Sequence, residues 1–203
     1  MNLKDNVDFI GHFGIKMYKK DGSIEEYEDK NLIMDKARKN MAELVGGYSQ
    51  GVAINKFVLG TKGHKADDIL DYKKVGNDGF TSVRTALFAE TTATAGEYYS
   101  IAFNPASTSA NFNTTAVSGH SSATPTVNET TNTINRTVSD RTVTYTITIK
   151  DANGNNKTNG ATTVIAYTEA ALYAGNDIFS MKTFPARVKE DTVKFEITWS
   201  IIF

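Results

Sequence analysis

The sequence contains no cysteine, and this absence excludes several classes of chemistry. Disulfide frameworks, cysteine-ligated zinc sites and thiol nucleophiles all require that side chain. A chain of 203 residues can nevertheless bury a substantial core, so it needs no covalent or metal cross-link to fold. The absence also fits synthesis in a reducing cytoplasm, which we expect for this protein.

An excess of charge is also lacking. The chain has 22 lysines and arginines against 23 aspartates and glutamates, and its basic residues form no cluster. A dedicated nucleic-acid binder neutralises phosphates with grouped lysines and arginines. We therefore expect no nucleic acid among its partners.

Long apolar segments are missing as well. No run approaches the roughly 20 apolar residues of a membrane-spanning helix. Residues 1–8 are polar and lack the apolar stretch of a secretory signal. We therefore expect no membrane partner.

What the sequence does contain is alternation with a period of two. Residues 13–18 alternate, Asp21-Gly22 supplies a turn, and residues 24–27 return, which predicts a β-hairpin. Residues 142–149 alternate even more regularly. The turn signal Asn153-Gly154 and a return over residues 162–167 predict a second hairpin there.

Only one segment has the period of a helix. Over residues 31–44, one face carries Ile33, Ala37, Met41, Leu44 and the following Val45. Two glycines follow, as at the end of many helices. The remaining strand candidates lie at residues 54–59, 98–103, 179–184 and 193–203, and residues 82–90 could be a strand or an irregular edge. The sequence thus predicts a mainly-β domain over residues 1–203, a β-sandwich or a partly closed barrel, with one helix in its N-terminal half.

Residues 104–137 differ in composition from the rest of the chain. They are rich in serine, threonine and asparagine and poor in large apolar side chains. Such a stretch buries too little surface to offset the entropy of ordering it. We interpret it as a long polar insertion or arm that either contacts a neighbouring subunit or lies in solvent.

Residues that could carry catalysis or bind a metal are scattered. His12, His64 and His120 lie in three unrelated contexts. Asp151, Asn153 and Asn155 have the spacing that opens a calcium-binding EF-hand loop, but the sixth and twelfth positions lack the required glycine and glutamate. An enzyme would need a polar cleft built from Glu169, Asp177, Arg187 or the histidines, and no spacing demands one. We therefore expect no enzymatic activity, no metal and no cofactor.

The aromatic residues leave a second functional hypothesis open. They could line a surface that binds carbohydrate, although aromatic residues at strand spacing more often form a core. Trp199, in the last strand, is expected to be a packing residue. The aromatic residues in question are Tyr98, Tyr99, Phe103, Phe112, Tyr145, Tyr167, Tyr173, Phe179, Phe184 and Trp199.

Three stretches in the order found here resemble a widespread family of bacteriophage virion proteins, described as tail, collar or fibre-associated structural subunits. One is the opening strand-turn-strand and helix. Another is residues 54–61 (INKFVLGT), similar to a strand that ends in a Gly-Thr-Gly turn, with Lys62 at the second glycine. The third is the C-terminal part. There, residues 164–173 resemble a strand leading into a Glu-Ala-Gly-Leu turn, with Ala171 in place of the glycine, and residues 181–187 and 195–203 are similar to the closing strands.

This resemblance implies a structural subunit of a phage tail, neck or collar. Such a subunit is found in the virion and acts by assembling with itself, as a ring or trimer, and with other virion proteins. The alternative is a module that decorates the capsid or tail or binds a host glycan. The chain ends on apolar residues, which suggests that the domain itself or a neighbouring subunit covers them. The candidate assembly contacts are Phe112, Val117, Ile134, Ile202 and Phe203.

Overall fold

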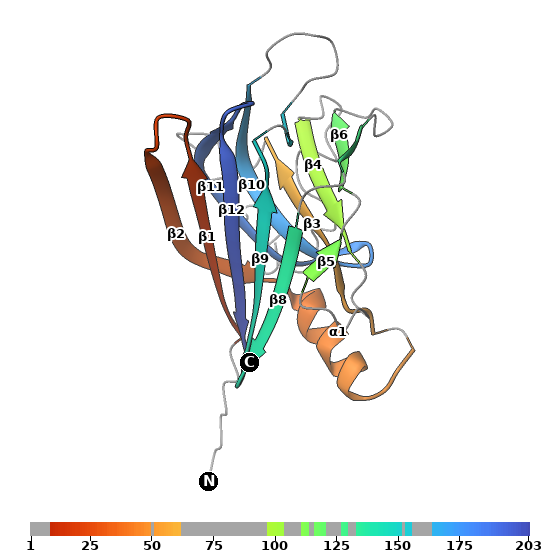
Figure 1. Ribbon diagram of the computed structural model, residues 1–203. Helices are drawn as coiled ribbons and strands as arrows, with labels where there is room; N and C mark the ends of the chain where they lie inside the picture. The colour runs from red at the N-terminus through yellow and green to blue at the C-terminus, as the bar shows by residue number, and fades with distance from the viewer. Residues whose placement is uncertain are drawn as a thin grey trace, which may run out of the picture.

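The computed structural model describes residues 9–49, 51–61, 97–103, 111–113, 116–120, 127–129, 133–151, 153–155 and 164–203. Within these residues the chain forms one helix and a single sheet of twelve strands (Figure 1). The helix is α1 (Asp35–Val45). The strands are β1 (Ile10–Tyr18), β2 (Ile24–Ile33), β3 (Ile54–Gly60), β4 (Glu97–Ala102), β5 (Asn111–Asn113), β6 (Ala116–His120), β7 (Val127–Glu129), β8 (Thr133–Ser139), β9 (Thr142–Ile149), β10 (Ile165–Ala174), β11 (Asp177–Lys189) and β12 (Lys194–Ile202).

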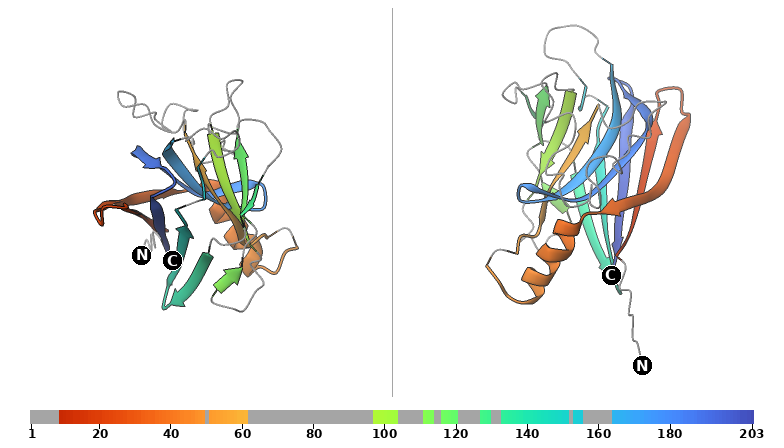
Figure 2. Two further views of the ribbon diagram at one scale, coloured as in Figure 1. Left: turned by 45° about the horizontal axis from the view of Figure 1, so that its top comes forward. Right: turned by 180° about the vertical axis from the view of Figure 1, so that it is seen from behind.

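The sheet curls so that its two halves face each other across one core (Figure 2). The strand order is β5-β8-β9-β12-β1-β2 in one half and β11-β10-β3-β4-β6-β7 in the other. Aromatic side chains meet between the halves: the Phe13 ring lies 5.2 Å from that of Phe184, and Trp199 lies 6.3 Å from Phe57. The predicted mainly-β fold with one helix is confirmed, in its partly closed barrel form.

The first predicted hairpin is confirmed. β1 and β2 pair antiparallel from Gly11 opposite Asn31 to Tyr18 opposite Ile24. Gly22 has a φ of 84°, a conformation that glycine adopts without steric cost, and the amide of Lys19 donates to the carbonyl of Ser23. The Asp-Gly signal therefore identified the turn correctly.

The second predicted hairpin is wrong. β9 pairs with β8 and β12, whereas β10 pairs with β11 and β3 in the other half of the sheet. Gly154 does adopt a turn conformation, with a φ of 67°, and its carbonyl accepts a hydrogen bond from the hydroxyl of Tyr167. The turn signal predicted a change of chain direction but could not show that both edges of β9 are occupied by other strands.

The helix begins later than predicted because β2 continues to Ile33. Leu32 and Ile33 pair with Met181 and Ser180 of β11 before α1 starts at Asp35. A difference also arises in β10. The resemblance implied a turn after Glu169, but the strand runs on to Ala174 and Ala171 is fully buried, so the chain turns only at Gly175.

The predicted polar insertion, residues 104–137, contains strands where it is described. β5 pairs with β8 in one half of the sheet, and β6 and β7 extend the other half beyond β4. Residues 133–137 belong to β8, which pairs with β9 along its whole length. The inward-facing residue of this strand is Ile134, which is fully buried. One large apolar side chain in a polar stretch thus suffices when neighbouring strands supply the remaining core.

Candidate assembly surface

Exposed apolar side chains gather at one end of the barrel. This end carries α1 and both ends of the described chain (Figure 1). Val45 and Tyr48, at the end of α1 and just after it, are 85% and 72% exposed. Val138, at the end of β8, is 69% exposed, and Ile10, at the start of β1, is 44% exposed. A group of exposed apolar side chains at one end of a protein indicates a surface that contacts other proteins.

An apolar hollow of about 190 Å³ lies between α1 and this end of the barrel. Met41 and Leu44 line it from the helix, Val52 from the loop that follows, and Val143 and Phe203 from the barrel. Phe203 is anchored there: its ring contacts Phe9 edge-on at 5.2 Å and its amide donates to the carbonyl of Arg141. The surface therefore has both projecting and recessed apolar elements.

The loop that presents Val52 is held tightly to the helix. The side chain of Asn40 donates to the carbonyl of Val52 at 2.6 Å and accepts from its amide at 2.7 Å. A Cβ atom at Gly51 would lie 2.7 Å from the backbone nitrogen of Leu44, so only glycine fits this close approach. Val52 is thus displayed in a fixed position, which reduces the entropy that an interface loses on forming.

The predicted assembly contacts fall into three groups. Ile202 and Phe203 lie partly buried at the apolar end. Ile134 contributes to the protein's own core, so in this fold its side chain is not available to a neighbour. Phe112 lies in β5 opposite Ile134, and Val117 lies in β6 opposite Ser100 and Asn128.

Sequence reasoning missed the most exposed of the large apolar side chains that the structure describes, Val45. It placed Val45 with Leu44 on the buried face of the helix, but only Leu44 of the two lines the hollow against the barrel, and Val45 is 85% exposed. Tyr48 also went unnoticed because it lies beyond the helix. Apolar residues on both sides of Gly46-Gly47 were the available signal, since the end of a helix in contact with water is usually polar.

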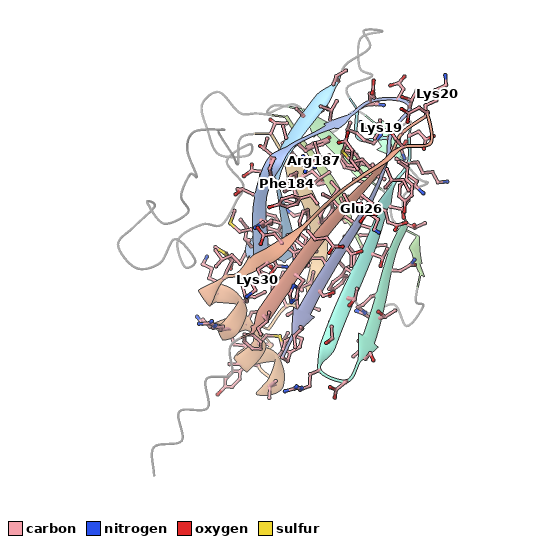
Figure 3. The ribbon with its side chains drawn as sticks, turned by 90° about the vertical axis from the view of Figure 1, so that its left-hand side faces the viewer. Lys19, Lys20, Glu26, Lys30, Phe184 and Arg187 are labelled. Carbon is pink, nitrogen blue, oxygen red and sulfur yellow. The ribbon has the colours of Figure 1, made fainter. Side chains whose placement is uncertain are left out.

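A second unusual feature is the seam between β2 and β11, where the two halves of the sheet join. The two strands share only two residue pairs, at Leu32 and Ile33, and then separate. Side chains bridge the gap: the rings of Tyr27 and Phe184 are 6.2 Å apart, and the guanidinium of Arg187 lies 5.3 Å from the Tyr27 ring. Figure 3 looks onto this seam, with Phe184 and Arg187 of β11 beside β2.

One ion pair closes the seam. Lys182 of β11 donates to Asp29 of β2, and this hydrogen bond holds the pKa of the Asp29 carboxyl below its ordinary value. The ammonium of Lys182 is largely buried, whereas the side chain of Asp29 is half exposed. Because solvent screens the carboxylate, the pair contributes at most about 1 kcal/mol to stability.

We expect Asp29→Asn to lower the free energy of unfolding at neutral pH by up to about 1 kcal/mol. A lowered folded-state pKa means that the stabilisation is complete above the unfolded value of about 3.9 and is lost as pH falls through the folded value. The difference between the variant and the wild type should therefore shrink in acid, as urea titrations at several pH values would show. Glu28→Gln is the matched control, because Glu28 forms no ion pair within the described residues. An equal loss in both variants would contradict the prediction.

Among the residues that the structure describes, the carboxylates and the arginine that an enzyme would need do not converge. Asp177 and Arg187 lie near opposite ends of β11, ten residues apart, and Asp177 pairs with Lys36. Glu169 is buried within β10. Ten residues of extended strand span about 33 Å, too far for a shared catalytic site.

The candidate metal ligands do not gather either. His12 is exposed on β1, His120 belongs to β6 in the other half of the sheet, and His64 lies outside the described residues. Across the described ranges, no group of three or more histidine and carboxylate side chains could hold a metal ion. At the EF-hand-like segment, the buried Lys189 donates to the backbone carbonyl of Asp151 at 2.7 Å, so an ammonium group lies against this loop.

Most of the aromatic side chains considered for glycan binding are buried. Burial raises the pKa of Tyr145 to about 12, against the opposing effect of Arg136. These rings pack in the core, although Tyr145 and Phe179 also border the apolar hollow beside α1, and their burial counts against the glycan-binding alternative. The buried rings of this set are Tyr99, Phe103, Tyr145, Tyr167, Tyr173, Phe179, Phe184 and Trp199.

Comparisons with protein-family models, with curated proteins and with solved structures each find no match. Among the helical residues that the structure describes, none form a helix long and apolar enough to cross a membrane. The functional argument therefore depends on the residues and surfaces of this chain.

Proposed function

We propose that this protein is a structural subunit of a bacteriophage particle, from its tail, neck or collar, that acts by assembling with itself and with other virion proteins. The observation that carries the assembly part is the apolar end, where Val45 and Tyr48 are largely exposed and an apolar hollow is already formed. In water these side chains favour contact with another apolar surface. Burial of each large apolar side chain contributes about 1.5–3 kcal/mol.

The assignment to a phage particle is supported by the ordered sequence resemblance. The fold is compatible with that role, because a curled sheet with a rigid apolar end can be repeated around a symmetry axis and buries the same patch in every copy. The scattered polar residues described above favour a structural over a catalytic role.

The test is the mass of the purified full-length protein in solution, measured by light scattering on a sizing column. We expect a discrete oligomer for the wild type. Val45→Lys combined with Tyr48→Lys should shift it to monomer, because two charges would have to be buried at the contact. Both side chains are exposed, so the substitutions should leave the fold intact, which circular dichroism would check.

The matched control places the same charges at the opposite end of the barrel. Ile24 and Val164 are 52% and 55% exposed, beside the β1–β2 turn and before β10. Ile24→Lys combined with Val164→Lys should leave the oligomer unchanged. A wild-type monomer, or equal dissociation in both double variants, would overturn assembly through the apolar end.

A further inference from the structure

The seam leaves one strand edge without a strand partner. β2 pairs with β1 over residues 24–31, but on its other side only Leu32 and Ile33 are paired. Residues 24–30 are exposed apart from the partly buried Tyr27, as expected for an edge strand. An unpaired edge presents backbone N–H and C=O groups that can hydrogen-bond to an added strand.

Of the two edges that line the seam, β2 is the better acceptor. In β11, Pro185 has no N–H to donate and lies where the register with β10 is shifted. In β2, residues 24–29 contain neither proline nor glycine and stay in unbroken register with β1. The amide of Lys30 is already bonded to the side chain of Asp29, which limits the free edge to residues 24–29.

Within the described residues, two charged groups at the seam form no ion pair. The Nε atom of Arg187 is buried without an acceptor, and its Nη1 reaches only the carbonyl of the adjacent Ala186, at 3.2 Å. On the outer face Glu28 forms no ion pair within the described residues, whereas Glu26 pairs with Lys16 and Glu25 pairs with Lys19. A buried donor without an acceptor is unfavourable, and a ligand that supplies the acceptor would remove this penalty.

These charges disfavour a second copy as the occupant. Antiparallel pairing of two β2 edges would bring Glu26 and Glu28 of one copy beside the same carboxylates of the other. Like charges directly opposite each other on paired strands are destabilising. The edge is therefore suited to a strand of different sequence.

We propose that the free edge of β2, residues 24–29, accepts an extended segment of a partner protein. The segment pairs antiparallel with β2, directs an acidic side chain inward to Arg187 and places a basic side chain on the outer face beside Glu28. Because successive residues of a strand point to opposite faces, the two charged residues are neighbours in the partner sequence. The proposal is independent of assembly through the apolar end.

The probe is a fluorescent seven-residue peptide, Thr-Val-Thr-Glu-Lys-Val-Thr, acetylated and amidated. Its matched control exchanges the glutamate and the lysine, which keeps composition and β propensity but reverses both faces. Fluorescence anisotropy should show that the full-length protein binds the first peptide about tenfold more tightly than the second. Hydrogen exchange should show new protection of the amides in residues 24–29.

Protein variants locate the site. Glu28→Lys should lower the affinity for the first peptide about tenfold. Arg187→Gln should also lower this affinity. Glu196→Lys, the same charge change on the outer face of the interior strand β12, should have no effect. Absence of binding, equal binding of both peptides, or an equal loss in Glu28→Lys and Glu196→Lys would overturn the proposal. Concentration-dependent protection of residues 24–29 in the protein alone would assign the edge to a second copy and overturn it as well.

Discussion

Replacing Trp199 by alanine should lower the free energy of unfolding by about 3–5 kcal/mol, the largest effect that we expect from one substitution. The indole is fully buried between the two halves of the sheet, 5.0 Å from the Phe13 ring and 6.3 Å from that of Phe57. Its Nε1–H donates to the hydroxyl of Ser180 at 3.1 Å. Alanine would leave a large cavity at the point where the halves meet and an unsatisfied buried hydroxyl. Urea unfolding followed by circular dichroism measures the change.

Trp199→Phe separates the two contributions. Phenylalanine keeps most of the ring packing but cannot donate to Ser180, so the loss should be smaller, about 1–3 kcal/mol. If both variants unfolded at the wild-type midpoint, Trp199 would not be the packing residue that joins the two halves.

Ile134→Ala should lower the free energy of unfolding by about 2–5 kcal/mol. Ile134 lies in the Ser/Thr/Asn-rich stretch, where an arm in solvent would tolerate truncation of a side chain. In the structure it is fully buried opposite Ile147 of β9. Thermal and urea unfolding of the variant therefore distinguish a core strand from an external arm.

Val138→Ala is the control within the same strand. Val138 is exposed, so its truncation should change stability by no more than about 0.5 kcal/mol. A small effect at both positions would favour the arm interpretation.

Deletion of residues 104–137 should unfold the protein, because it removes β8 and with it one neighbour of β9. Oligomerisation is therefore better tested with the substitutions at Val45 and Tyr48.

Local signals predicted local structure well. The Asp-Gly turn between two alternating runs was sufficient for the β1–β2 hairpin, and the alternation of residues 195–201 predicted which side chains of β12 face inward. Both depend on residues close in sequence, whose conformation is set by backbone sterics and by one buried face. The burial of Trp199, Phe195 and Ile197 follows from the same pattern.

The pairing of strands that lie far apart in the chain could not be predicted from the sequence. The 142–149 and 162–167 segments read as a hairpin because a turn signal lies between them, yet β9 and β10 belong to different halves of the sheet. A strand with one buried face can pair with any strand of matching pattern. The choice depends on the edges left free by the rest of the chain.

By itself, the sequence determined that this protein is mainly β with one helix, and which faces of its long strands are apolar, because periodicity and turn chemistry act over a few residues. Only the tertiary structure decided which apolar residues remain outside. α1 extends past the barrel and leaves Val45 and Tyr48 exposed, and β2 separates from β11 and leaves a free edge beside Arg187 and Glu28. Exposure depends on what packs against a residue from elsewhere in the chain, and a local pattern does not contain that information.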